Sequence, residues 1–235
     1  MNPILILHGA LGSASQLEPV KSMMESNGTI VHSLNFSGHG GASFQNNFGI
    51  EQFAADTLQY IKSHQLKQIT IFGYSMGGYV ALWLAKQYPE VVGKIFTLGT
   101  KFDWSVESAA HEVKKLNAEK ILEKMPAFAR ILENRHKPND WKMLMQKTAD
   151  MMMALGERPL LTKEIFETIQ QPTLICLGDQ DDMADRNYSE QVASFLPSGE
   201  FLLLENTPHP IERVDLKKLI SIISTSLINS PPPTS

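Results

Sequence analysis

Gly73-Tyr74-Ser75-Met76-Gly77 decides the fold expected of this 235-residue chain. The pentapeptide follows Ile69-Thr70-Ile71-Phe72, a β-branched and apolar run typical of a buried strand, and a segment with helical character comes directly after it. A serine at a sharp turn from strand to helix lies in a strained backbone conformation, where flanking side chains would collide with the turn. The two glycines remove these collisions, so we expect the Ser75 hydroxyl to be exposed.

Two later segments contain the partners that a serine nucleophile needs, a base that takes its proton and an acid that orients the base. Residues 171–177 form an apolar run that predicts a buried strand, and Asp181 lies in the turn after it. His209 follows a second apolar run, residues 201–204, which predicts the last strand. We therefore predict Ser75 as nucleophile, Asp181 as acid and His209 as base, in that chain order.

With these segments in place, the chain resembles the α/β-hydrolase superfamily from residue 4 to about residue 227. The stretch Leu7-His8-Gly9-Ala10-Leu11-Gly12-Ser13 resembles the oxyanion loop of that family, and residues 35–40, Asn-Phe-Ser-Gly-His-Gly, resemble its glycine-rich turn. The resemblance implies an oxyanion hole formed by the backbone N–H groups of Ala10 and Met76.

The identity of the acid has alternatives. Three other carboxylates crowd the same turn, namely Asp179, Asp182 and Asp185. Asp181 matches the G-x-x-D position of the family, whereas some members that resemble it carry the acid after the preceding core strand, where this chain has Asp103. We keep Asp103 as the second candidate.

The remaining histidines and the single cysteine predict no metal site and no cofactor. None of the seven histidines has metal-ligand spacing with another or with Cys176. His8 and His39 lie in the two loop motifs, so we interpret them as hydrogen-bonding supports for those loops. Cys176 lies within an apolar run and is expected to be a core residue.

The order of segments predicts an α/β fold. Residues 30–34 read as a strand and residues 50–64 as an amphipathic helix, and such alternation predicts a doubly wound, mostly parallel sheet. By resemblance, we expect the α/β-hydrolase fold with its N-terminal sheet edge trimmed. The expected organisation is a first core part (1–100), a helical lid inserted between core strands (101–164), a second core part (165–228), which ends in a helix over residues 211–227, and a disordered tail (229–235).

The lid segment reads as several helices. One of them has an apolar face at helical spacing, formed by Trp141, Leu144, Met145, Thr148, Met152 and Leu155. Packing on the core would explain this face, and so would a wall over Ser75, for which we name Trp141, Met145 and Met152 as pocket candidates. Acidic and basic residues alternate over residues 112–137, which predicts solvated helix faces, with a site for an anionic substrate group as the alternative.

Composition agrees with an enzyme that works on small molecules. The chain is 43% hydrophobic and has a formal net charge of −4, so we expect no general attraction to nucleic acid or to anionic membranes. We see no signal peptide and no run of membrane-spanning length, which makes the cytoplasm the expected compartment. The oligomeric state cannot be read from the sequence.

These residues predict a serine hydrolase of the carboxylic ester hydrolase type (EC 3.1) that cleaves a small ester, thioester or related acyl substrate through a Ser75 acyl-enzyme, without a cofactor. Two other functions remain open, because one fold hosts several chemistries. One is a lyase that resembles those of the menaquinone pathway, with Ser75 as a base. The other is a receptor or regulator that binds a small molecule and then a protein partner.

Overall fold

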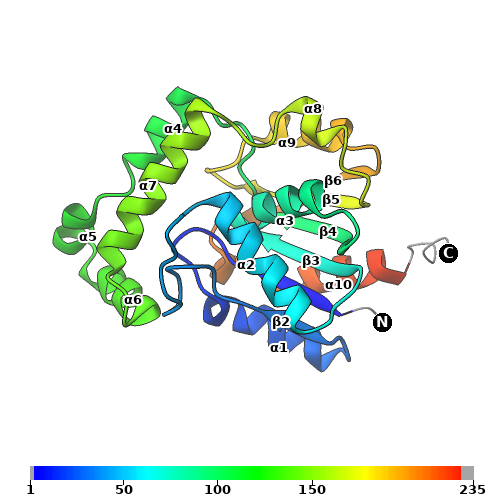
Figure 1. Ribbon diagram of the computed structural model, residues 1–235, viewed down its shortest axis with the longest axis horizontal. Helices are drawn as coiled ribbons and strands as arrows, with labels where there is room; N and C mark the ends of the chain where they lie inside the picture. Colours follow the sequence, from blue (N-terminus) through cyan, green and yellow to red (C-terminus); the bar gives the residue numbers. More distant parts are fainter. Residues whose placement is uncertain (1–2, 229–235) are drawn as a thin grey trace.

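The computed structural model describes residues 3–228 (Figure 1). One sheet of six strands runs through the molecule in the order β2-β1-β3-β4-β5-β6, and each neighbouring pair is parallel. The strands are β1 (Ile4–Leu7), β2 (Val31–Ser33), β3 (Ile69–Tyr74), β4 (Val92–Leu98), β5 (Thr173–Gln180) and β6 (Gly199–Pro208). The predicted α/β class with a parallel sheet is confirmed.

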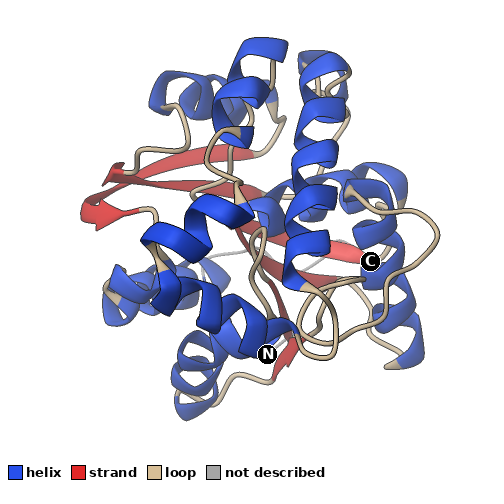
Figure 2. Ribbon diagram, turned by 90° about the vertical axis from the view of Figure 1, so that its left-hand side faces the viewer, coloured by secondary structure: helices blue, strands red, loops and turns tan. Residues whose placement is uncertain are grey.

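Helices cover both faces of this sheet. Because side chains alternate across a strand, β1 directs Leu5 and Leu7 into one apolar core and Ile4 and Ile6 into another. The first core is closed by α2 (Ile50–Ser63), α3 (Met76–Gln87) and α9 (Arg186–Phe195), and the second by α1 (Glu18–Ser26) and α10 (Leu216–Ile228). This is the doubly wound arrangement expected from the sequence. Figure 2 shows the strands between layers of helices.

Several predicted boundaries differ from those in the structure. The second strand is shorter than predicted, with Ile30 and Leu34 outside it, and Ile30 is 64% exposed. The C-terminal helix begins at Leu216 rather than at Ile211, since a separate 3-10 turn, η2 (Ile211–Arg213), precedes it. Asp215 lies between the two and caps α10, with its carboxylate accepting from the N–H of Lys217 at 3.0 Å. The tail predicted to be disordered, 229–235, lies outside the described residues.

A group of helices stands to one side of the sheet between β4 and β5 (left in Figure 1, and toward the viewer in Figure 2). We call α4 to α7 the helical insertion; its members are α4 (Val106–Val113), α5 (Ala118–Lys124), α6 (Pro126–His136) and α7 (Trp141–Glu157). A short α8 (Lys163–Phe166) then leads back to the sheet. The insertion has a small core of its own, formed by Ile121, Ala129, Leu132, Trp141 and Met145.

Cys176 lies inside β5 and is 2% exposed. Burial raises the pKa of its thiol to about 12, so the thiolate that would act as a nucleophile does not form near neutral pH. The expectation of a core cysteine is met. No helix within residues 3–228 is both long enough and apolar enough to cross a membrane.

Candidate active site

The turn from β3 into α3 holds Ser75 in the backbone conformation expected of it, with φ of 52° and ψ of −119°. A non-glycine residue in this region costs about 1 to 3 kcal/mol. The glycines on either side are required by close packing: a Cβ at Gly73 would lie 2.4 Å from the nitrogen of Gly78, and one at Gly77 would lie 2.3 Å from the carbonyl oxygen of Leu7. The serine is therefore presented at the carboxyl end of its strand, where ligands bind in sheets of this type.

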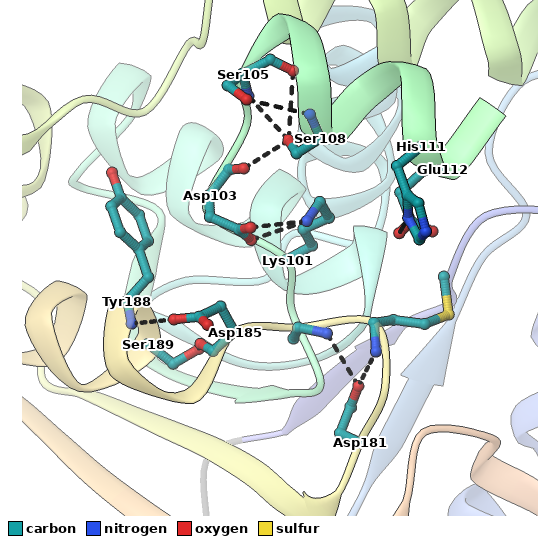
Figure 3. Close-up of polar contacts among 12 residues, drawn as sticks. Lys101, Asp103, Ser105, Ser108, His111, Glu112, Asp181, Asp185, Tyr188 and Ser189 are labelled. Atoms are coloured by element: carbon teal, nitrogen blue, oxygen red, sulfur yellow. Dashed lines mark hydrogen bonds and ion pairs between the residues drawn. The ribbon is translucent and has the colours of Figure 1, made fainter. Parts of the chain in front are cut away.

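Asp181 and His209 meet at the same end of the sheet. The Nδ1–H of His209 donates to Asp181 Oδ2 at 2.8 Å, and both side chains are nearly buried, with 9% and 2% of their surfaces exposed. The other carboxylate oxygen of Asp181 accepts from the N–H groups of Met183 and Ala184 at 2.9 and 3.0 Å (Figure 3). With Nδ1 engaged as donor, Nε2 of His209 is left as the acceptor that a general base needs.

The other candidate acids make contacts elsewhere. Asp103 forms a bidentate ion pair with Lys101, with distances of 3.0 and 2.9 Å (Figure 3). Asp185 caps α9 by accepting from the N–H of Tyr188 at 2.7 Å. Asp179 accepts from the N–H of Thr207 at 3.0 Å. Asp182 is exposed in the turn. Of these carboxylates, Asp181 is the one hydrogen-bonded to His209.

The N–H of Ala10 is aimed by the carbonyl group that precedes it. Gly9 O accepts from the Nδ1–H of His8 at 2.8 Å and from the N–H of Gly12 at 3.1 Å. A trans peptide unit is planar, so fixing this carbonyl fixes the Ala10 N–H in the opposite direction. Met76 is the first residue of α3, where N–H groups have no partner within the helix. Ala10 and Met76 line one cavity together with Ser75.

His8 fits the supporting role expected from the sequence. Its Nε2 accepts from the N–H of Phe36 at 3.2 Å, which leaves the proton on Nδ1 for Gly9 O. Burial lowers the pKa of His8 to about 3, so the ring is neutral near pH 7. His39 lies beside it, with ring centroids 5.0 Å apart, and contacts Ser37 O through Nδ1 at 3.2 Å.

A cavity of about 180 Å³ opens over Ser75 and His209. Its apolar wall comes from two helices of the core and one of the insertion, and consists of Ile50, Tyr79, Met151, Met152 and Leu155. A polar side is formed by Gln16, Lys101, Trp104 and Glu112. A cavity of this size and lining suits a small acyl group with an apolar chain.

The predicted wall residues need a correction. Met152 does line the cavity, but Trp141 and Met145 belong to the separate core of the insertion. The reason is the length of α7: its second half reaches the cavity, while its first half packs against α5 and α6. Helical spacing identified the apolar face correctly and did not reveal that two different partners divide it.

The sequence pattern did not predict that Glu112 lines the cavity. It stands among alternating charges that predict a solvated face, yet it is 5% exposed, lines the cavity and forms an ion pair with Lys115 at 3.0 Å. Tyr74 was also missed: its O–H donates to the backbone carbonyl of His209 at 3.1 Å. The pair of Glu112 with Lys115 is local, but the burial of Glu112 at the cavity and the bond from Tyr74 to His209 depend on segments that the fold brings together.

Comparisons with known proteins agree with this geometry. The family model for the alpha/beta hydrolase fold matches residues 2–150, which include Ser75, Ala10 and Met76. Serine hydrolase BPHL of Mus musculus is 24% identical over 88% of this chain and 72% of its own length. A probable alcohol acetyltransferase of Wickerhamomyces anomalus is 33% identical over 38% of this chain, and the match spans only 27% of that protein.

Solved structures share the fold across nearly the whole chain. A putative lipase from Acinetobacter baumannii AYE superposes with a TM-score of 0.80 at 20% identity, covering 97% of this chain and 84% of its own. An esterase from Thermogutta terrifontis gives a TM-score of 0.77 at 17% identity, covering 97% of this chain and 90% of its own. With a strained serine between strand and helix, a parallel sheet, and a matching family model over more than half of its length, the chain belongs to the alpha/beta hydrolase fold family.

Proposed function

We propose that the chain is a serine hydrolase that cleaves a small carboxylic ester, thioester or related acyl compound through a covalent acyl-enzyme on Ser75. The observation that carries this proposal is the 2.8 Å hydrogen bond between His209 and Asp181 at the edge of a cavity that also contains Ser75. A serine, a histidine with a free Nε2 and a buried carboxylate are the groups that acyl transfer requires.

In the first half of the reaction, Ser75 Oγ attacks the carbonyl carbon of the substrate while His209 Nε2 takes the hydroxyl proton. The carbonyl oxygen becomes an oxyanion, which accepts hydrogen bonds from the N–H groups of Ala10 and Met76. His209 then gives its proton to the leaving group, and the bond between carbonyl carbon and leaving group breaks. Asp181 keeps the imidazole in the correct tautomer and stabilises its transient positive charge.

In the second half, water replaces the leaving group. His209 takes a proton from the water as it attacks the acyl-enzyme, and returns a proton to Ser75 Oγ as the acid product departs. These steps use the side chains of the chain and no added cofactor. We further propose that residues 101–164 act as a lid between two core parts, 1–100 and 165–228, with Met152 against the acyl chain.

The relatives supply a second candidate for the acceptor. A probable alcohol acetyltransferase is 33% identical over 38% of this chain. An acyl-enzyme that passes its acyl group to an alcohol uses the same first half-reaction, so ester synthesis would need only an alcohol in place of water. Product analysis after adding ethanol to an ester assay separates the two: an ethyl ester indicates transfer, and free acid alone indicates hydrolysis.

Steady-state kinetics with p-nitrophenyl acetate and butyrate test the proposal. Ser75→Ala is expected to abolish turnover, and Asp181→Asn to lower kcat by roughly 10³- to 10⁴-fold, because the histidine then adopts the wrong tautomer. Ser43→Ala, at an exposed serine, is the matched control and is expected to keep wild-type kinetics. Ser75→Ala with wild-type turnover would contradict the assignment of Ser75 as the nucleophile. Folded wild-type protein without turnover would contradict the hydrolase and favour the receptor or lyase alternatives.

A further inference from the structure

The helical insertion contacts the predicted oxyanion loop at Leu11, a residue with a strained backbone. Leu11 has a φ of 54°, a conformation that non-glycine residues rarely adopt, so neighbouring contacts must hold it. Its side chain packs against the small core of the insertion. Its carbonyl oxygen accepts two hydrogen bonds from the end of α6, one from Arg135 Nη1 and one from His136 Nε2, both at 3.0 Å.

The tautomer of His136 follows from its two contacts. Nδ1 accepts from the N–H of Gly40 at 3.0 Å, so the ring proton must lie on Nε2, where it is donated to Leu11 O. His136 is fully buried, and burial lowers its pKa to about 4, so the ring holds this neutral form near pH 7. Arg135 is a charged donor near pH 7. The Leu11 carbonyl is thus held by one cationic and one neutral donor from the same helix end.

Two planar peptide units connect the hydrogen bonds at Leu11 O to the proposed oxyanion hole. The carbonyl of Leu11 and the N–H of Gly12 belong to one unit, and the N–H donates to Gly9 O at 3.1 Å. The carbonyl of Gly9, which accepts this hydrogen bond, and the N–H of Ala10 belong to the second unit. Holding Leu11 O therefore fixes the direction of the Gly12 N–H, which acts with His8 on Gly9 O and so on the direction of the N–H of Ala10, a residue that lines the cavity.

We infer that Arg135 and His136 are positioning residues for the oxyanion hole, so that the helical insertion takes part in catalysis through the chain Arg135/His136, Leu11 C=O, Gly12 N–H, Gly9 C=O, Ala10 N–H. This inference rests on the proposed function. Besides fixing direction, a guanidinium at one end of a hydrogen-bonded chain polarises each unit along it, and such chains strengthen each bond by about 10–30%. The Ala10 N–H becomes a better donor to the oxyanion as a result.

Arg135→Ala is the variant that tests this inference, because Arg135 is only partly buried and its loss leaves His136 in place. Misplacing a transition-state donor lowers kcat by roughly 10- to 100-fold while KM changes little, since the ground-state carbonyl relies less on the hole. Arg135→Lys and His136→Gln each keep a side-chain donor for Leu11 O and should keep most of the wild-type kcat. Arg130→Ala, at an exposed arginine of the same helix, is the matched control.

Two further readouts separate positioning from a general loss of structure. A trifluoromethyl ketone forms a tetrahedral adduct with Ser75, so its affinity should fall in Arg135→Ala by the same factor as kcat/KM. Deuterium exchange at the Gly12 amide should accelerate in Arg135→Ala and stay unchanged in Arg130→Ala. Unchanged kcat, or a change confined to KM, would overturn the inference.

Failure of the proposed function would look different. Wild-type protein that neither turns over esters nor binds the ketone would contradict the serine hydrolase itself. Deuterium exchange at the Gly12 amide then still tests whether Arg135 holds the loop. Faster exchange in Arg135→Ala supports this, and equal rates in Arg135→Ala and wild type overturn it.

Discussion

Tyr74 and His209 are joined by a buried hydrogen bond, in which the phenol O–H donates to the backbone carbonyl of the histidine at 3.1 Å. Tyr74 is the last residue of β3 and precedes Ser75, whereas His209 follows β6, at the far edge of the sheet. The strand that presents the serine therefore also holds the loop that carries the histidine. Burial raises the pKa of Tyr74, so the phenol stays protonated and remains a donor.

Tyr74→Phe removes this donor and leaves a buried carbonyl without its partner. We expect a loss of about 1 to 3 kcal/mol in the free energy of unfolding, together with a lower kcat as the histidine loop loosens. Urea unfolding and ester kinetics measure the two effects. Tyr60→Phe is the control, because its phenol contacts the part-buried His32 at 3.2 Å, away from the cavity. Equal stability and kcat in Tyr74→Phe and wild type would refute this account of the loop.

Gly99 lies against the bond between Asp181 and His209. A Cβ there would be 2.8 Å from Asp181 Oδ2 and 3.1 Å from His209 Nδ1, and the backbone φ is 62°. Gly99→Ala is expected to push the two side chains apart and lower kcat/KM by at least about 100-fold. Gly28→Ala is the matched control: its φ is 80°, but a Cβ there would have nothing within 4 Å. It carries the same kind of backbone strain, so it should lose stability and keep its activity.

The buried histidines predict acid sensitivity. Burial lowers the pKa of His8 to about 3 and that of His136 to about 4, while the unfolded chain titrates near the ordinary value of 6.5. Below about pH 6.5 these histidines bind protons in the unfolded state and not in the folded state. Their full contribution to the free energy of unfolding is therefore present above that pH, and it is lost as the pH falls toward 4. Each such histidine contributes up to about 1.4 kcal/mol per pH unit within its window.

Urea unfolding between about pH 5 and 7.5 checks this prediction, in a range where most carboxylates stay ionised. His8→Asn cannot titrate, so the fall in its unfolding free energy with decreasing pH should be shallower than in the wild type. His64→Asn, at an exposed histidine, is the matched control. A wild-type slope in His8→Asn would mean that His8 is protonated in the folded protein.

Met152 is expected to set the preferred acyl chain length. It is 8% exposed and lines the cavity, so Met152→Ala should enlarge the space for substrate while costing about 2 to 5 kcal/mol of stability. The ratio of kcat/KM for p-nitrophenyl octanoate to that for the butyrate should rise, and this ratio does not depend on the fraction of folded protein. Met143→Ala, at a residue that is 48% exposed on the same helix, should leave the ratio unchanged. A constant ratio in Met152→Ala would place the acyl chain elsewhere.

Patterns local in the sequence predicted the fold and part of the site geometry. The G-x-S-x-G turn, the apolar runs and their order determine the parallel sheet, because strand and helix periodicities are properties of short segments. Asp181 was distinguished from its neighbours by its resemblance to the G-x-x-D position of the family. The apolar pattern predicts a helix from Ile211, but α10 begins at Leu216, and Asp215 is the capping residue in the sequence that indicates this later start.

Contacts between distant segments could not be predicted. Trp141 and Met145 share a helix face with Met152, and only the packing of α5 and α6 decides that they lie away from the cavity. Arg135 and His136 contact Leu11 across more than half of the chain. Their charges and spacing were those of an ordinary solvated helix end, so no sequence pattern distinguished them.

Intact-protein mass after incubation with a fluorophosphonate tests the central claim most directly, because the probe forms a covalent bond with an activated serine. We expect a single adduct on the wild type, none on Ser75→Ala, and much slower labelling of His209→Ala, with Ser43→Ala labelled like the wild type. An adduct retained in Ser75→Ala, or no adduct on folded wild-type protein, would contradict the assignment of Ser75 as the nucleophile.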